Sequence, residues 1–246
     1  MLKNLIKKIA KPAGYQIIRI DPKYVQYPLN ATPEGVFDEW LKKYNVSTLL
    51  DVGANTGYWA REVRESGFTG RILSFEPQSK AYQQLQQMAH GDNNWEVFHY
   101  ALGEEDNNAQ INISENSVSS SFLEICEDHI KAQSDSRYVK KEMIELKKID
   151  TIFNQLNLSE EIIFMKIDTQ GFEKKVLSGA KESLKKVVGI QIEMSFRELY
   201  KGETLFVHMV DYMITLGFKL VHLKDGFRDK NTGELLQVDG IFYRLD

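Results

Sequence analysis

Cysteine is nearly absent from this sequence, which has one residue of that type, Cys126, in 246 positions. A single cysteine excludes a disulfide within the chain, and without a C-x-x-C or H-E-x-x-H pattern a zinc site is not expected. Positive charge is not in excess either, since 31 Lys and Arg face 35 Asp and Glu, for a net charge of −4. Because a phosphate backbone requires a basic surface, we expect no nucleic-acid partner.

Long apolar runs are also missing, including from the first eleven residues, MLKNLIKKIAK. Their leucines and isoleucines recur at helical spacing with lysines on the other face, which predicts neither a signal peptide nor a membrane span. Two interpretations stay open. We favour a helix packed on its own domain, and the alternative is weak contact of residues 1–11 with a membrane surface. Without a secretion signal, the expected location is the cytoplasm.

What the sequence does contain is a regular alternation of short apolar strands and amphipathic helices. Hydrophobic residues make up 42% of the chain, which is ample for a core. A parallel sheet covered on both faces is the fold that this rhythm predicts. In chain order the expected elements are the strand STLLDVG, the helix GYWAREVRESG, the strand GRILSFEP, the helix SKAYQQLQQMA and the strand WEVFHYAL.

The alternation breaks at about residues 104–157, which we interpret as an insertion with extra strands at NAQINIS and EMIELKK. It resumes with the strand EEIIFMKID, the helix GFEKKVLSGAKESLKK and the strand VVGIQIEMSF. The last two strands, FKLVHL and QVDGIFYRL, are joined by a link too short for a helix, so they should pair antiparallel. Residues 1–45 are expected to form a helical extension packed on the core, and residues 46–246 the main domain.

The stretch LLDVGANTG predicts a buried strand that ends at Asp51 and runs into a ligand-binding turn. Gly53 and Gly57 bracket this turn, and the helix that follows offers unpaired N–H groups. An NAD-binding turn would have the pattern G-x-G-x-x-G, which is absent. The second strand ends in an acid, Glu76 of LSFEP, and a carboxylate there can accept both hydroxyls of a ribose. An adenosine ligand without a diphosphate fits this pattern best.

These features resemble the S-adenosylmethionine-dependent class I methyltransferases, and more narrowly the FkbM-type methyltransferases. The resemblance implies an α/β, Rossmann-like doubly wound sheet of seven strands in the order 3-2-1-4-5-7-6. The last strand would be antiparallel, with helices on both faces. The motifs that carry the resemblance are DVGANTGYW, FEP, YALGEED, ELKKIDTIF, MKIDTQGFEKKVLSGA, IQIEMSFRELYKGE and QVDGIFYR.

The same resemblance implies S-adenosylmethionine as the cofactor, S-adenosylhomocysteine as its product, and methylation of a hydroxyl on a small-molecule or glycan acceptor. A sugar of a surface glycan or of a glycosylated natural product is the expected acceptor. The alternatives are a non-sugar metabolite, a nucleotide-dependent oxidoreductase, or a cofactor-binding protein without catalysis. Tyr200 and Asp239 are expected on the substrate side. The cofactor is expected to contact Asp51, Gly53, Asn55, Gly57, Glu76, Ala101 and Leu102.

Two further carboxylates are expected at the ends of neighbouring strands, Asp168 at the end of the fourth and Glu193 at the end of the fifth. The carboxyl ends of strands in an open parallel sheet form the ligand crevice, so both are candidate catalytic residues. Together they suit a general base for an alcohol, or they hold a divalent cation that polarises the hydroxyl. In the purely structural alternative, Asp168 caps the helix that starts near Gly171 and Glu193 pairs with a lysine. The serine run Ser119–Ser121 either closes over the ligand or is an ordinary loop. The sequence leaves the metal requirement and the oligomeric state open.

Overall fold

The structure is a computed structural model that describes residues 33–244. The helix expected within residues 1–11, and with it most of the N-terminal extension, therefore lies outside the described residues. The chain divides into two compact units, Met1–Phe37 and Asp38–Asp246, and the fold below is that of the second. The first described helix, α2 (Pro33–Lys43), begins with a proline, a residue that suits the first turn of a helix.

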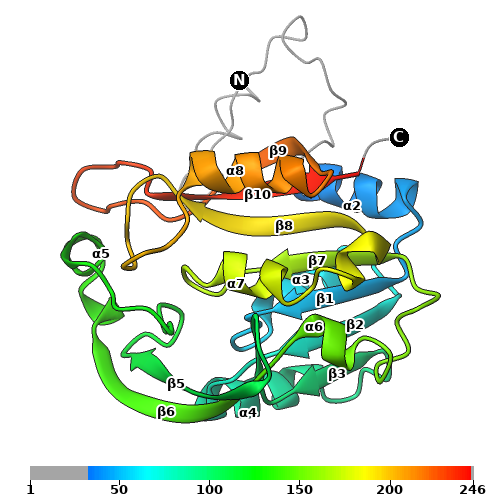
Figure 1. The fold of residues 1–246 in the computed structure, drawn as a ribbon, viewed down its shortest axis with the longest axis horizontal. Helices are drawn as coiled ribbons and strands as arrows, with labels where there is room; N and C mark the ends of the chain where they lie inside the picture. Colours follow the sequence, from blue (N-terminus) through cyan, green and yellow to red (C-terminus); the bar gives the residue numbers. More distant parts are fainter. Residues whose placement is uncertain (1–32, 245–246) are drawn as a thin grey trace, which may run out of the picture. The chain divides into compact units, whose positions relative to one another are not determined.

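A seven-stranded sheet forms the centre of the unit, in the order β3-β2-β1-β7-β8-β10-β9 (Figure 1). Six of its strands run in the same direction, and β10 runs antiparallel to both of its neighbours, β8 and β9. When the strands of this sheet alone are counted along the chain, the order is 3-2-1-4-5-7-6, so the predicted topology is confirmed. The strands are β1 (Thr48–Val52), β2 (Arg71–Phe75), β3 (Trp95–Phe98), β7 (Ile163–Ile167), β8 (Val187–Ser195), β9 (Lys219–Asp225) and β10 (Gln237–Tyr243).

Helices cover both faces of this sheet, as the alternation of strands and helices predicts. On one face Leu50 and Met165, both fully buried, pack with residues of α6, α7 and α8 in a single hydrophobic cluster. Successive strand residues point to opposite faces, so Leu49 and Phe164 are directed to the other one and are equally buried. The helices are α3 (Tyr58–Glu65), α4 (Ser79–Ala89), α5 (Glu127–Ala132), α6 (Ile149–Ile152), α7 (Glu173–Ser178) and α8 (Phe206–Thr215).

A second, three-stranded sheet contains β4 (Ala101–Leu102), β6 (Tyr138–Lys147) and β5 (Asn107–Ser114), in the order β4-β6-β5. The sequence predicted one strand over WEVFHYAL, and this is wrong, because the chain leaves the large sheet after Phe98. Ala101 and Leu102 pair instead with β6, a strand far along the chain whose pairing the local pattern does not show. The small sheet and α5 lie beyond the carboxyl ends of the parallel strands (Figure 1).

The helix predicted over GFEKKVLSGAKESLKK is also shorter than expected, because α7 ends at Ser178 and a separate 3-10 turn follows at Ser183–Lys186. The reason is a close backbone approach at Gly179, where a Cβ atom would lie 1.8 Å from the carbonyl oxygen of Gly103. Asp150 then accepts hydrogen bonds from the backbone N–H groups of Glu182 and Ser183, which fixes the second turn.

Two methionines in strands test how much the large sheet depends on its core. Met165 in β7 is fully buried, whereas Met143 in β6 is 68% exposed. We expect Met165→Ala to lower the free energy of unfolding by about 2–5 kcal/mol, because it leaves a cavity between two layers. The matched Met143→Ala should change it by less than about 0.5 kcal/mol. Urea unfolding followed by circular dichroism measures both, and equal losses would contradict the layered core.

Candidate active site

A row of polar side chains crosses the large sheet on one face, each residue directly beside the next on the neighbouring strand. Ser74 of β2 pairs with Asp51 of β1, Asp51 with Lys166 of β7, and Lys166 with Gln191 of β8. All four are buried, and Asp51 has no exposed surface. The hydroxyl of Ser74 lies 3.1 Å from Asp51 Oδ2. A continuous row of hydrogen-bonding and charged side chains therefore crosses an otherwise apolar sheet.

Lys166 lies at the centre of this row and connects it to the end of β7. Its Nζ is 3.4 Å from Asp51 Oδ1 and 3.3 Å from Asp168 Oδ2, and it donates a hydrogen bond of 3.0 Å to the carbonyl oxygen of Gly53. Burial lowers the pKa of Lys166, but the carboxylates of Asp168 and Asp51 outweigh it and raise this pKa above its usual range. Burial raises the pKa of Asp51, and Lys166 opposes that rise. The ammonium group thus stays charged between two acids.

The turn after β1 is shaped for close contact with the end of β7. Gly53 has φ +77°, and a Cβ atom there would lie 1.9 Å from the carbonyl oxygen of Asp168, so only glycine fits. Asn55 also has a left-handed backbone, and its N–H donates to Glu76 Oε2 over 2.8 Å. Gly57, with φ +88°, is the N-cap of α3 and faces Leu85 and not the ligand side.

Glu76 follows β2 and is almost completely buried, with 2% of its surface exposed. Its two oxygens accept backbone N–H groups, Oε2 from Asn55 and Oε1 from Gln78 at 2.7 Å. Burial raises its pKa to about 7, although these two hydrogen bonds oppose the rise. Each oxygen keeps a second lone pair, so the carboxyl group can still accept hydrogen bonds from a ligand.

A cavity of about 390 Å³ opens between this turn, the ends of β7, β8 and β10, and the small sheet. Its volume lies within the range of small-molecule sites. Three residues that the sequence assigned to the site do not line it: Asp51 and Gly57 lie behind the turn, and Tyr200 is fully buried behind the wall. The predicted site residues that do line the cavity are Gly53, Asn55, Glu76, Ala101, Leu102, Asp168, Glu193 and Asp239.

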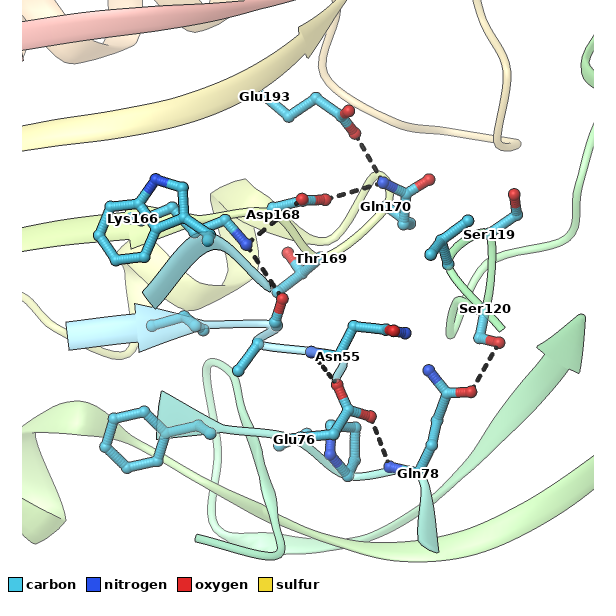
Figure 2. Close-up of a pocket in the computed structure, with 18 of the residues that line it drawn as sticks. Asn55, Glu76, Gln78, Ser119, Ser120, Lys166, Asp168, Thr169, Gln170 and Glu193 are labelled. Atoms are coloured by element: carbon cyan, nitrogen blue, oxygen red, sulfur yellow. Dashed lines mark hydrogen bonds and ion pairs between the residues drawn. The ribbon is translucent and has the colours of Figure 1, made fainter. Parts of the chain in front are cut away.

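The two candidate catalytic acids are joined through one amide, that of Gln170 (Figure 2). Gln170 Nε2 donates to Asp168 Oδ1 over 2.8 Å and to Glu193 Oε2 over 2.7 Å. The hydroxyl of Tyr200 lies 2.6 Å from Gln170 Oε1 and fixes the orientation of the amide. Tyr200, predicted on the substrate side, thus positions Gln170 from behind the wall.

The structural alternatives for the two acids are not what the structure contains. The loop before α7 is held by Glu173, whose Oε1 accepts the N–H groups of Thr169 and Gly171, so Asp168 is not the cap of this helix. Glu193 accepts two amides, from Gln170 and from Gln237 at 2.8 Å, and not a lysine. Burial raises the pKa of Glu193 well above its usual value, and the carboxylates of Asp168 and Asp239 raise it further.

The serine-rich loop closes over the cavity, as one of the two sequence interpretations expects. Ser117 Oγ accepts from Asn55 Nδ2 over 3.3 Å, and its carbonyl oxygen accepts from Gln78 Nε2 over 3.1 Å. Ser120 donates to Gln78 Oε1 over 3.0 Å, and the carbonyl of Ser119 lies 3.2 Å from the hydroxyl of Tyr200. The loop therefore contacts both the glycine-turn side and the Asp168 side of the cavity.

The metal alternative finds no support in the described part of the chain. Among residues 33–244, no three His, Cys, Asp or Glu side chains are arranged to hold a metal ion. The side chains next to Asp168 are the ammonium of Lys166 and the amide of Gln170, and both are hydrogen-bond donors to its oxygens. We therefore derive no step through a metal. In the same range, no helix combines the length and hydropathy needed to cross a bilayer.

Sequence reasoning missed three residues that organise the site, namely Lys166, Gln170 and Gln237. Lys166 had a visible signal, because it is the one charge within the buried strand Ile163–Ile167. Gln170 and Gln237 had none, because their importance comes from the amide hydrogen bonds that both donate to Glu193.

A parallel sheet with an antiparallel seventh strand, and a glycine turn facing an acid after the second strand, define the class I methyltransferase fold. The sequence comparison is more specific, because the pattern of the methyltransferase FkbM domain matches residues 51–220. The chain belongs to this family. It is 25% identical to the 2-O-methyltransferase NoeI of Sinorhizobium fredii over 162 residues, 63% of this chain and 66% of that protein. The match thus spans slightly less than two thirds of this relative.

Solved structures show more distant similarity. An rRNA methylase from Streptococcus thermophilus shares 12% identity with a TM-score of 0.46, over 89% of this chain and 100% of that one. TrmK of M. capricolum, in complex with S-adenosylhomocysteine, shares 7% identity with a TM-score of 0.46, over 83% of this chain and 67% of that one. Similarities at this level define neither the substrate nor the reaction of the present chain.

The raised pKa of Glu173, about 7 because of burial, predicts how stability depends on pH. Its contribution is fully present below the unfolded pKa near 4.5 and is lost as the pH rises to 7. In Glu173→Gln the amide oxygen can accept the same N–H groups without titrating. We expect the variant to match the wild type near pH 4.5 and to exceed it at pH 8 by on the order of 2–3 kcal/mol.

Urea unfolding at several pH values measures this difference, with Glu182→Gln at an exposed position as the matched control. A variant that loses as much stability as the wild type between pH 5 and pH 8 would show that Glu173 is ionised in the folded protein.

Proposed function

We propose that this protein is an S-adenosylmethionine-dependent O-methyltransferase whose acceptor is a hydroxyl of a sugar, in a surface glycan or in a glycosylated natural product. The observation that carries the proposal is the placement of Asp168. Its carboxylate, 35% exposed, lines the same cavity as Gly53, Asn55 and Glu76. A base beside a nucleoside site is the arrangement that a methyl transfer to an alcohol requires.

The residues around the glycine turn fit the cofactor. Glu76 presents a buried carboxyl group that can accept ribose hydroxyls, and Ala101 and Leu102 provide an apolar surface for the adenine. Gly53 brings backbone to the cavity edge without a side chain. S-adenosylmethionine, when bound, supplies a methyl group on a sulfonium. Asp51, which does not line the cavity, supports this turn from behind through Lys166.

Asp168 would perform the proton transfer. An alcohol is a weak nucleophile at neutral pH, and a carboxylate within hydrogen-bonding distance accepts its proton as the oxygen–carbon bond forms. Lys166 contacts Asp168 at 3.3 Å, and Gln170 fixes the orientation of the Asp168 carboxyl group by a hydrogen bond of 2.8 Å. The remaining gain comes from alignment of the hydroxyl in a site that excludes water.

The cavity wall beyond Asp168 suits a polyhydroxylated acceptor. Gln191, Gln237 and Asp239 line it with amide and carboxyl groups, which can both donate and accept hydrogen bonds. Phe227 adds an aromatic surface for the apolar face of a sugar ring. The similarity to NoeI, a 2-O-methyltransferase, also supports transfer to an oxygen.

The same proposal places the enzyme in the cytoplasm, where S-adenosylmethionine is made, and gives it no nucleic-acid partner. The net charge of −4 supports the second point, since it offers no basic surface for a phosphate backbone.

The cofactor half of the proposal is tested by titration calorimetry with S-adenosylhomocysteine. We expect binding by the wild type and a loss of about 1.5–3 kcal/mol in Glu76→Ala, because a buried carboxyl group that accepts ribose hydroxyls is removed. The exposed Glu65→Ala serves as the control and should bind like the wild type. Tight NADH binding with no response to S-adenosylhomocysteine would refute the proposed cofactor.

The catalytic half is tested by Asp168→Asn, which keeps the shape and the acceptor for Gln170 but removes the charge. We expect turnover to fall by about 10²–10⁴-fold, the usual contribution of a general base, while affinity for S-adenosylhomocysteine and the melting temperature stay close to wild type. Release of S-adenosylhomocysteine is measured with a panel of methyl glycosides and, in parallel, of phenols.

The exposed Asp211→Asn in α8 is the matched control and should retain full turnover. Wild-type turnover in Asp168→Asn would remove this residue from the chemical step. Turnover with phenols and none with glycosides would replace the sugar acceptor by a non-sugar metabolite.

A further inference from the structure

The amide of Gln170 donates hydrogen bonds to one carboxyl oxygen of each of the two candidate acids. Both of its N–H groups are used, one on Asp168 Oδ1 and the other on Glu193 Oε2. Its nitrogen faces an oxygen of the Asp168 side chain, and its own oxygen faces the hydroxyl of Tyr200. Gln170 thus brings two carboxyl groups within the reach of one nitrogen atom.

Glu193 receives its hydrogen bonds on one oxygen only. Gln170 and Gln237 both donate to Oε2, at 2.7 and 2.8 Å. Within the described part of the chain, Oε1 has no hydrogen-bond partner, and Glu193 lines the cavity. Because Oε2 already accepts two hydrogen bonds, a proton on this carboxyl group would be carried by Oε1. Oε1 is also the oxygen that remains available to a ligand.

The charges around Glu193 come from every element that packs against it. Asp168 and Lys166 belong to the end of β7, Glu173 to α7, and Asp239 to β10, where it is the direct register partner of Glu193. The pKa of Glu193 is raised first by burial and next by Asp168, Asp239 and Glu173, and Lys166 opposes this rise. Lys224 of β9 acts on Asp239, whose own pKa is raised to about 6 by burial.

The positive charge in this group is closer to Asp168 than to Glu193. Lys166 Nζ lies 3.3 Å from Asp168 Oδ2, whereas Glu193 is contacted by two neutral amides. Glu193 would place a second carboxylate at the amide nitrogen that already contacts Asp168, so Glu193 takes up a proton instead.

We propose that the two acids have opposite roles: Asp168 is the base, and Glu193 is a neutral carboxylic acid whose Oε1–H donates a hydrogen bond to an oxygen of the acceptor. The second half rests on the proposed function, whereas the location of the proton does not. The acceptor would then present a hydroxyl to Asp168 and a neighbouring oxygen to Glu193. Adjacent oxygens of this kind are what a vicinal diol of a sugar offers.

The proton on Glu193 is tested in the free protein with Glu193→Gln, which replaces a neutral acid by a neutral amide of the same shape. Between pH 5 and pH 8 the folding equilibrium constant of the wild type should fall with pH more steeply than that of the variant, by up to a further tenfold per pH unit. The reason is that the unfolded chain releases this proton and the folded chain keeps it. The exposed Glu198→Gln should keep the wild-type slope. Equal slopes in wild type and Glu193→Gln would overturn the proposal.

A second measurement does not depend on how well that variant folds. The infrared spectrum of the wild type at pH 7 should contain a carbonyl band of a protonated carboxylic acid that weakens in Asp239→Asn. That variant removes a neighbouring carboxylate and so lowers the pKa of Glu193. A band that Asp239→Asn leaves unchanged would assign the proton elsewhere.

The donor role is tested with a methyl glycoside that supports turnover. We expect the KM of the wild type for this acceptor to rise at alkaline pH, where Glu193 ionises, and that of Glu193→Gln to stay level, because the amide N–H group remains a donor. A turnover loss in Glu193→Gln as large as in Asp168→Asn would make Glu193 the base and refute the assignment. Absence of methyl transfer altogether would refute the proposed function and leave the two measurements on the free protein valid.

Discussion

The ion pair between Asp51 and Lys166, inside the central sheet, is the constraint on which the rest of the site depends. Burying two charges is expensive, and apolar residues of similar size would often give equal or greater stability. What the pair achieves is positional. The Lys166 ammonium also contacts the Gly53 carbonyl and Asp168, so one group joins the turn after β1 to the end of β7. The same junction excludes any side chain at Gly53.

Acids in this site differ in role because their surroundings differ, not because of their chemical type. Asp168 is partly exposed and next to an ammonium group, whereas Glu193 is next to two amides and several other acids. Glu173 and Glu76 are buried and accept backbone N–H groups, one before a helix and one after a strand. Proximity of an acid to the cavity is thus a poor guide to its charge.

The sequence predicted the sheet order well because strand order follows from alternation and from a final link too short for a helix. It also predicted the turn at Gly53 and the acid at Glu76, because both follow directly from short motifs, LLDVGANTG and LSFEP. It failed at Ala101 and Leu102 as part of a longer strand, and at Gly179 as part of a longer helix, because distant backbone decides both. The roles of Gln170 and Gln237 could not be predicted from the sequence, because they arise from hydrogen bonds to Glu193 that form only in the folded chain.

The small sheet and the large sheet share no strand, so changes in one can be largely independent of changes in the other. Between Leu102 and Ile149 the chain forms β5, α5 and β6, and its ladder to β4 comprises just two residue pairs, Ala101 with Leu146 and Leu102 with Lys147. The polar row of the large sheet takes no strand from this segment. Apart from its serine-rich loop, which contacts Asn55, Gln78 and Tyr200, such a segment can be lengthened, shortened or exchanged between relatives with little effect on the polar row. The architecture therefore favours descendants that keep one chemistry and diverge in what they modify.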